Sequence, residues 1–243
     1  MDATYDIIGI NYSDLRKPDA RIARMIHDGL GSAKTVLNIG AGTGSYEPSD
    51  RDVTALEPSE AMIQQRPAQA APAIQGVAED LPFADDSFDA AMAVLTVHHW
   101  TDFAQGLAEL RRVARDRVVI LTFDSEHRSA WLNDYIPELV TLDDGQMPPM
   151  AEYREVLGPV DIVPVPIPHD CTDGFLYAYW RRPAAYLDPR IRTGMSSFWA
   201  IDTVEEKLKR LAADLESGRW AERNGHLMKE DAIDLGYRLV VSR

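Results

Sequence analysis

Short apolar runs alternate with amphipathic stretches along the first half of the chain. The amphipathic stretches repeat apolar side chains every third or fourth residue, as Ile22, Ile26 and Leu30 do, a spacing typical of helices packed on a core. This alternation predicts βαβ units, a parallel sheet and right-handed crossovers. We expect strands at residues 35–40, 53–57, within 71–83, at the start of 88–100 and at 117–124, and helices at 19–31, from Ser59 onward, and at 101–114 with Thr101 as cap.

The second half of the chain follows a different pattern, with helical stretches interrupted by prolines and a stretch dense in aromatic side chains. Prolines 164, 166 and 168 lack the N–H of a ladder, so their segment reads as an edge or irregular strand. We predict an α/β fold with a doubly wound, mostly parallel seven-stranded sheet and a helical, aromatic cap. We expect one domain over residues 1–243, with its core sheet at about 19–124 plus C-terminal strands and a cap insertion at about 125–220.

The turn after the first expected strand carries glycines at alternate positions, followed by an acid after the second strand. Gly40, Gly42 and Gly44 allow a ligand to approach the backbone without meeting a Cβ atom, and Glu57 stands where a ribose-binding acid is expected. The dinucleotide fingerprint G-x-G-x-x-G would need a third glycine at Ser45 and a helix that holds pyrophosphate. Only about a dozen residues separate Gly44 from Glu57, so the spacing favours S-adenosylmethionine over NAD.

Four segments together resemble a known family. VLNIGAGTG resembles motif I of the class I S-adenosylmethionine-dependent methyltransferases, and VTALEPSEAMI resembles their acidic second motif. VAEDLPFADDSFDAAMAVLTVHHW resembles the segment through their third and fourth strands, and YDIIGINYSDLRKPDA resembles their entrance flap. The resemblance runs from Tyr5 to about Phe123 and is closest to the small-molecule group related to ubiquinone and menaquinone methyltransferases.

The resemblance implies a role for each matching position. The backbone at Gly40, Gly42 and Gly44 would pack on the aminoacyl end of the cofactor, and Glu57 would accept hydrogen bonds from both ribose hydroxyls. The adenine ring would lie among Pro58, Met62, Ala78, Leu81 and one of the two acids Glu79 and Asp80.

Four further positions would complete the cofactor site. Leu95 would offer its carbonyl to the methionine amine, and Arg16 would pair with the methionine carboxylate. Tyr12 would lie over the sulfonium through a cation–π contact. Asn38 departs from the family, which usually has an acid there, so this chain either binds the cofactor more weakly or compensates with another acid.

The acceptor side is less defined by the sequence. His98 and His99 follow the fourth strand, where a histidine can act as a base for an oxygen or nitrogen acceptor. Adjacent residues of a strand point to opposite sides, so we expect one of them to face the ligand and favour His98. His127 and His169 are further candidates, Arg181 and Arg182 are candidates for an acceptor carboxylate, and the spacing indicates no metal site.

Charge and composition narrow the function classes. The formal net charge of −14 disfavours nucleic acid and anionic membranes as partners. The single cysteine excludes a disulfide framework within the chain, and the N-terminus lacks an apolar signal core. We expect a cytoplasmic monomer or homodimer that transfers a methyl group from S-adenosylmethionine to a small organic molecule, releasing S-adenosylhomocysteine. The alternatives are an NAD(P)-dependent Rossmann oxidoreductase and a non-methylating S-adenosylmethionine-binding protein.

Overall fold

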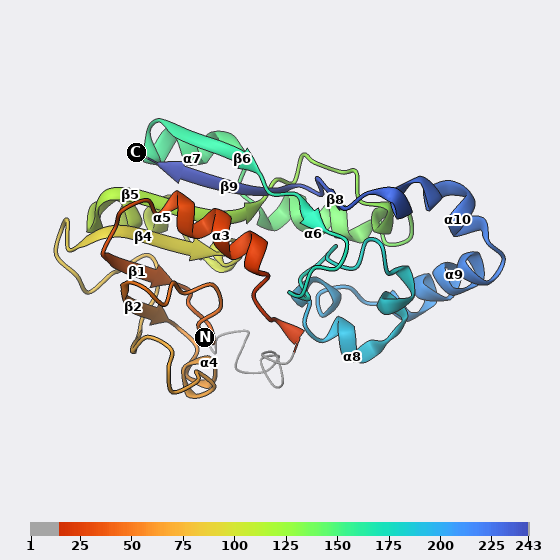
Figure 1. The fold of residues 1–243 in the computed structure, drawn as a ribbon, viewed down its shortest axis with the longest axis horizontal. Coiled ribbons are helices and arrows are strands. Elements are labelled where there is room, and N and C mark those ends of the chain that lie inside the picture. The colour runs from red at the N-terminus through yellow and green to blue at the C-terminus, as the bar shows by residue number, and fades with distance from the viewer. Residues whose placement is uncertain (1–14, 243) are drawn as a thin grey trace.

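The protein was analysed as a computed structural model, which describes residues 15–242. Its centre is a seven-stranded sheet in the order β3-β2-β1-β4-β5-β9-β6, visible on the left of Figure 1. All neighbouring pairs from β3 to β5 are parallel, and β9 runs antiparallel to both β5 and β6. The expected doubly wound, mostly parallel sheet is therefore confirmed. Its strands are β1 Thr35–Ile39, β2 Asp52–Glu57, β3 Ala73–Gln75, β4 Phe88–Val94, β5 Ala114–Phe123, β6 Val160–Pro164 and β9 Tyr237–Ser242.

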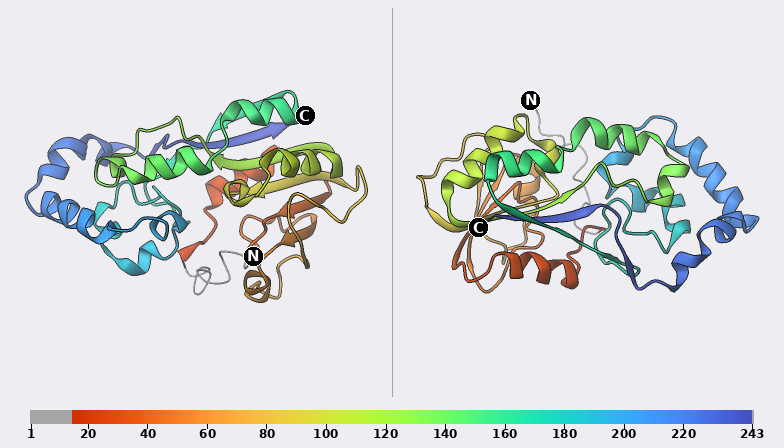
Figure 2. Two further views of the ribbon diagram at one scale, coloured as in Figure 1. Left: turned by 180° about the vertical axis from the view of Figure 1, so that it is seen from behind. Right: turned by 90° about the horizontal axis from the view of Figure 1, so that it is seen from above.

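Helices cover both faces of this sheet, as the view from above in Figure 2 shows. On one face, α3 (Ala20–Gly29) packs against β5 and β9. Its buried Ile22 and Ile26 join one apolar core, and Asp19 caps the helix by accepting a hydrogen bond from the Arg21 N–H. On the other face, α5 (Phe103–Val113) and α7 (Met150–Leu157) pack together over a second core.

Two helix caps test the sequence predictions. Ser59 caps α4 (Glu60–Gln64) by accepting from the Met62 N–H, as expected. Thr101 does not cap α5, because it lies one residue before the cap position. Its N–H and that of Asp102 both donate to the Glu79 carboxylate. The side chain of Asp102 caps α5 instead, accepting from the Gln105 N–H.

A second lobe extends from the sheet, on the right of Figure 1. Its core is aromatic: the rings of Tyr186, Trp220 and Tyr135 all meet Trp131 edge-on, and the Trp131 indole donates to the Trp180 carbonyl at 2.8 Å. Its elements are η2 Trp131–Asp134, α6 Glu138–Gln146, β7 Ile167–Pro168 paired with β8 Ala232–Ile233, η3 Pro183–Leu187, α8 Pro189–Arg192, η4 Ser196–Phe198, α9 Val204–Glu216, α10 Arg219–Asn224 and η5 Gly225–Lys229.

The range of about 125–220, expected to form the cap, is divided between the two lobes. α7 and β6 return from it to the main sheet, where β6 forms the edge next to β9. The prolines fit this place because Pro164 ends an edge strand, whose outer side needs no ladder partner. The sheet lobe thus takes residues from inside the expected insertion.

Candidate active site

The turn after β1 replaces a helix between the first two strands. Residues 40–51 form turns and bends with no helical segment. A helix N-terminus is the feature that would hold the pyrophosphate of a dinucleotide, and this turn lacks one. The NAD(P) alternative therefore loses its principal structural requirement.

The three glycines of the turn serve different purposes. All three have positive φ. A Cβ at Gly40 would lie 2.0 Å from the Thr96 hydroxyl, so this position needs glycine to let the ends of β1 and β4 meet. A Cβ at Gly44 would approach Glu47 and Ala70, away from the ligand side. A Cβ at Gly42 would meet only the end of the Met62 side chain, at 3.3 Å, so this glycine keeps the backbone bare toward the cavity.

Glu57 ends β2 and fixes the turn from the opposite side. Its carboxylate accepts a hydrogen bond from the Gly42 N–H at 2.8 Å and one from the Ser59 N–H at 2.9 Å. The residue is only 5% exposed. Each carboxylate oxygen offers two acceptor sites, and these backbone donors hold the group in one orientation on the cavity wall.

Asn38, which stands in place of the usual acid, belongs to a small buried network. Its amide donates to the Glu47 carboxylate at 3.1 Å, and Arg66 pairs with the same oxygen at 2.7 Å. Arg66 also donates to the Gly42 carbonyl at 2.9 Å. Glu47 is thus the acid nearest to Asn38, but it is neutralised by Arg66 and stabilises the glycine turn.

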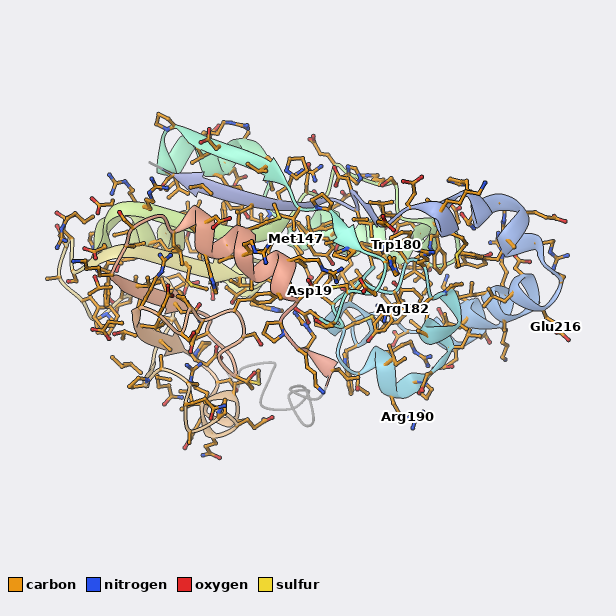
Figure 3. The ribbon with its side chains drawn as sticks, in the orientation of Figure 1. Asp19, Met147, Trp180, Arg182, Arg190 and Glu216 are labelled. Atoms are coloured by element: carbon orange, nitrogen blue, oxygen red, sulfur yellow. The ribbon has the colours of Figure 1, made fainter. Side chains whose placement is uncertain are left out.

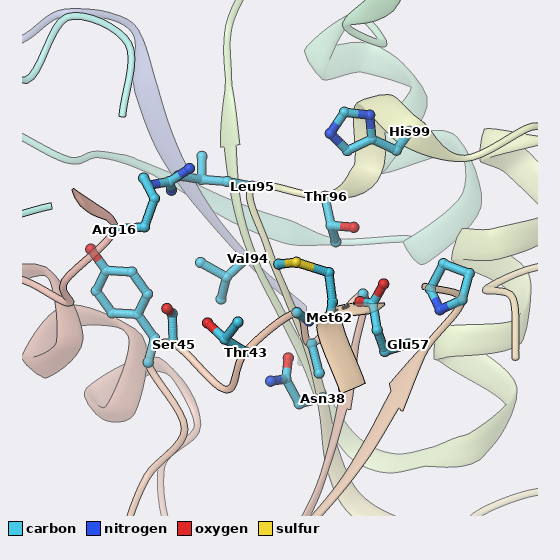
Figure 4. A pocket seen from close by; sticks show the side chains of 15 residues that line it. Arg16, Asn38, Thr43, Ser45, Glu57, Met62, Val94, Leu95, Thr96 and His99 are labelled. Atoms are coloured by element: carbon cyan, nitrogen blue, oxygen red, sulfur yellow. Dashed lines mark hydrogen bonds between the residues drawn. The ribbon is translucent and has the colours of Figure 1, made fainter. Parts of the chain in front are cut away.

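These elements enclose a cavity at the carboxyl ends of β1, β2 and β4 (Figure 4). Its empty volume is about 710 Å³ including the open mouth, within the range of small-molecule sites. Leu95, at its wall, has a φ of 51°, which turns the chain sharply from β4 into η1 (Val97–His99). The lining residues are Arg16, Asn38, Gly40, Ala41, Gly42, Thr43, Ser45, Tyr46, Glu57, Pro58, Met62, Val94, Leu95, Thr96 and His99.

Most of the expected cofactor residues meet at this cavity, and five do not. Gly44, Ala78, Glu79, Asp80 and Leu81 are outside its lining. Asp80 is exposed, Ala78 and Leu81 are buried, and the Glu79 carboxylate is occupied by the backbone N–H groups at the start of α5. The structure therefore does not bring this segment to the cavity. Tyr12 lies outside the described residues.

The two adjacent histidines face different cavities. They lie on the 3₁₀ turn η1 and not on an extended strand, and their ring centroids are 3.9 Å apart. His99 lines the first cavity and His98 lines a second one, and the expectation that one of them faces the ligand stays a prediction. Burial of the imidazole among protein atoms lowers the pKa of His99 to about 4, although part of this side chain is accessible from the cavity. Burial also lowers the pKa of His98 well below its usual value, with His99 and Arg16 adding to the effect.

The second cavity adjoins the first and has an empty volume of about 500 Å³. Arg16 and Leu95 line both. Asp143, on α6, lines this cavity and is 7% exposed. Burial raises the pKa of Asp143 to about 7, with Asp144 adding to the rise. The remaining walls come from Phe123, Met147, Phe175, Leu176, Gly194, Met195, Ser196, Ser197 and Tyr237.

A buried cluster ties the two lobes together beside both cavities. The guanidinium of Arg16 donates through Nε to Asp173 at 2.5 Å, and the Tyr46 hydroxyl donates to the other oxygen of Asp173 at 2.8 Å. Asp173 is 1% exposed. Tyr46, from the glycine turn, and Arg16 thus meet on the same carboxylate. This cluster fixes Arg16 at the cavity junction.

The remaining candidates lie elsewhere. His127 contacts Ser129 and the Asp234 carbonyl, and His169 stands at the β7 end beside Asp231. Arg181 and Arg182 donate to backbone carbonyls of Glu230, Cys171 and Ala178. Within residues 15–242 no group of acids, histidines or cysteines could hold a metal ion, and no helix has the length and apolar character needed to span a membrane.

The cavity fits S-adenosylmethionine on three observations. Gly42 leaves the backbone bare toward it, Glu57 presents a fixed carboxylate at the β2 end, and Met62 and Pro58 supply apolar surface beside that carboxylate. Ala41, Thr43, Ser45, Tyr46, Val94 and Thr96 also line it and were not expected. Ala41 and Thr43 lie within VLNIGAGTG and Ser45 and Tyr46 directly follow it, so the glycine turn itself was the signal that could have found these four.

The methyltransferase-domain family model matches residues 37–122. A rice 2-methyl-6-phytyl-1,4-hydroquinone methyltransferase is 27% identical over 152 residues, which cover 58% of this chain and 44% of the relative. A malonyl-[acyl-carrier protein] O-methyltransferase of Erwinia pyrifoliae is 42% identical over 95 residues, 37% of this chain and 36% of the relative. The chain thus spans less than half the length of these curated relatives.

The match to a solved structure extends over the whole described fold. The crystal structure of an Anabaena variabilis protein, described as a methyltransferase from an antibiotic biosynthesis pathway, is 34% identical to this chain. It superimposes with a TM-score of 0.87 and covers 95% of this chain and 100% of its own. With the glycine turn, the fixed Glu57 and the sheet order already described, the chain belongs to the class I methyltransferases that use S-adenosylmethionine as cofactor.

Proposed function

We propose that this methyltransferase acts on a small organic acceptor bound in the second cavity, beside the cofactor in the first. The supporting observation is that Leu95 and Arg16 line both cavities, so the two spaces meet at the end of β4. By their names, the rice relative methylates 2-methyl-6-phytyl-1,4-hydroquinone and the Erwinia relative methylates malonyl-[acyl-carrier protein]. A cavity of about 500 Å³ with mostly apolar walls suits a small molecule.

The cofactor would be held by backbone and by one carboxylate. Glu57 would accept hydrogen bonds from the ribose hydroxyls, and the bare backbone at Gly40 and Gly42 would pack on the aminoacyl part. Residues on either side would complete the site: Arg16 and Asn38 at the aminoacyl end, Leu95 through its carbonyl, and Pro58 and Met62 at the adenine. When bound, S-adenosylmethionine supplies a methyl group activated by the sulfonium charge.

The protein's contribution to transfer is alignment, exclusion of water and proton removal. Direct displacement at carbon requires the acceptor atom on the axis of the breaking bond, and Phe175 and Met195 of the cap line the second cavity and would shield a bound acceptor from part of the solvent. His98 lines this cavity, and its imidazole would accept the proton of an oxygen or nitrogen acceptor. Burial lowers the pKa of His98 well below its usual value, which keeps the imidazole neutral at pH 7 and makes it a weak base. His99 would stand on the cofactor side.

Both lobes would act as one catalytic unit. The second cavity takes Phe123 and Tyr237 from the sheet and Asp143 from α6. The first cavity is lined by residues 16–99 and is joined to the cap by the ion pair between Arg16 and Asp173. The chain is therefore proposed to be a single domain with a cap, not two separable domains.

Calorimetric titration with S-adenosylhomocysteine tests the cofactor assignment. The wild-type protein is expected to bind it, and Glu57→Gln is expected to weaken binding about 100-fold, because an amide cannot accept at both oxygen positions. Glu155→Gln, which removes an exposed carboxylate on α7, is the matched control and should leave the affinity unchanged. An unchanged affinity in the Glu57 variant would refute the assignment of this carboxylate.

A further inference from the structure

The second cavity is walled by a cluster of aromatic rings. The ring centroids of Phe175 and Tyr237 are 4.6 Å apart, and those of Phe123 and Tyr237 are 5.4 Å apart. Tyr177 backs this group, with its centroid 5.7 Å from that of Phe123. Aromatic faces carry negative potential and attract cations most strongly where water is excluded. The two methionines of the wall add polarisable sulfur to the same surface.

Asp143 places a carboxyl group against this aromatic wall. The residue lines the cavity from α6 with 7% of its surface exposed, while its neighbour Asp144 points outward and pairs with Arg128 at 2.7 Å. Asp143 shares a side-chain hydrogen bond with Tyr177, and the charge of a carboxylate buried in such surroundings remains costly unless a cation also faces it. The Arg16 guanidinium lies over the Phe175 ring, 6.0 Å from its centroid, and is paired with Asp173, so the described walls direct no cation at Asp143.

The arginines that could have received an anion are directed elsewhere. Arg181 and Arg182 donate to backbone carbonyls within the cap, and Figure 3 places Arg182 inside the cap and Met147 of the cavity wall nearer the sheet. The net charge of −14 also draws cations toward the protein and repels anions. Wall, carboxyl group and overall charge all favour a positively charged ligand.

We infer that the second cavity binds an acceptor that carries an amine, with its ammonium group placed between Asp143 and the faces of the aromatic rings. This inference rests on the proposed function. Asp143 lines only the second cavity, whereas Leu95 marks the junction with the cofactor cavity. The ammonium is therefore an anchor, and the atom that receives the methyl group lies at another part of the acceptor, toward His98.

Calorimetry on the full chain saturated with S-adenosylhomocysteine tests the inference with three probes of one shape. These are 2-phenylethylammonium, 2-phenylethanol and phenylacetate at pH 8. We expect the ammonium to bind at least roughly tenfold more tightly than the alcohol, and phenylacetate to give no heat. Asp143→Asn should abolish that preference. Asp144→Asn, which removes the same charge from the exposed side of the same helix, should keep it.

Each outcome supports or overturns either this inference or the proposed function. Equal binding of ammonium and alcohol, tighter binding of phenylacetate, or a preference that survives Asp143→Asn would overturn the inference. Absence of heat from all three probes, in protein that binds S-adenosylhomocysteine, would also overturn it and leave the proposed function standing. Absence of S-adenosylhomocysteine binding would instead refute the proposed function and the inference with it. The ranking of probes on wild-type protein decides the matter even if a variant fails to fold.

Discussion

The two cavities that meet at Leu95 are built in different ways. The first takes its shape from two backbone features, the glycine turn and the sharp bend after β4, and from one carboxylate held by two main-chain N–H groups. The second is made of side chains from β5, β9, α6 and the 174–197 segment. A backbone site presents the same groups whatever the neighbouring side chains are, so it suits an invariant cofactor. A side-chain site can change with few substitutions, so it suits a ligand that differs between relatives.

Gly40→Ala should give the largest effect, because the turn of the first cavity tolerates no Cβ there. The new Cβ would lie 2.0 Å from the Thr96 hydroxyl at a φ of 61°, and the clash with the left-handed strain is expected to lower the free energy of unfolding by about 4 kcal/mol. Urea unfolding of both proteins measures this difference in the free energy of unfolding. The control Gly145→Ala, in α6 with no atom within 4 Å of its Cβ, should stabilise by up to about 1 kcal/mol. A loss below about 1 kcal/mol in Gly40→Ala would mean that the turn is not constrained as described.

Asp173→Asn comes next, because this residue joins the two regions. It removes a buried charge that faces Arg16 and accepts from Tyr46, and the expected loss of unfolding free energy is about 3 kcal/mol. It should also weaken S-adenosylhomocysteine binding, since Arg16 loses its fixed position at the cavity junction. Asp170→Asn breaks an exposed pair with Arg21 and should change neither quantity. Equal effects in both variants would show that the buried cluster of Arg16, Tyr46 and Asp173 does not stabilise the protein or position Arg16.

Asp143→Asn should raise the free energy of unfolding, unlike the two preceding variants, and the size of this gain should depend on pH. The pKa of Asp143 is about 7 in the folded protein against an ordinary 3.8, so the folded state holds a proton that the unfolded chain releases. Its favourable contribution is complete below pH 3.8 and is lost as the pH rises through 7. Relative to wild type, the variant should therefore gain about 2 kcal/mol of unfolding free energy between pH 5 and pH 8.

Unfolding at the two pH values provides the measurement. The charged and titratable groups around Asp143 are Asp144 on the same helix, Tyr177 and Tyr237 against it, and Arg16 and His98 on the same cavity. They are present in both proteins, so their own titration largely cancels in the comparison. A gain that is the same at both pH values would show that Asp143 ionises normally in the folded state. A stabilised variant that loses amine recognition would mark Asp143 as a residue retained for binding at the expense of stability.

The difference between the cavities also explains what the sequence could predict. Gly40, Gly42, Glu57 and Leu95 lie within short motifs whose spacing specifies backbone geometry, and the structure brings them together as expected. Ala78, Glu79, Asp80 and Leu81 were expected at the adenine by motif position alone. Their placement depends on how the loop after β3 packs, and Glu79 turns to the start of α5 instead.

The second cavity was largely beyond prediction. Its aromatic content was visible in the sequence as a stretch dense in aromatic side chains, and Phe175 of the cavity wall comes from that stretch. Asp143, Phe123 and Tyr237, however, are separated by long stretches of sequence and meet only through the antiparallel pairing of β5 with β9 and the packing of α6. No local pattern carries that information, because the contacts depend on tertiary packing. The same reason hid the return of β6 to the sheet.

A crystal structure of the protein with S-adenosylhomocysteine tests the central claim most directly. The account predicts the Glu57 carboxylate within hydrogen-bonding distance of the ribose hydroxyls, the aminoacyl part against the Gly40–Gly42 backbone, and the sulfur facing the second cavity beside Leu95. A nucleoside bound away from Glu57, or a sulfur turned away from the cavity that holds His98 and Asp143, would contradict it.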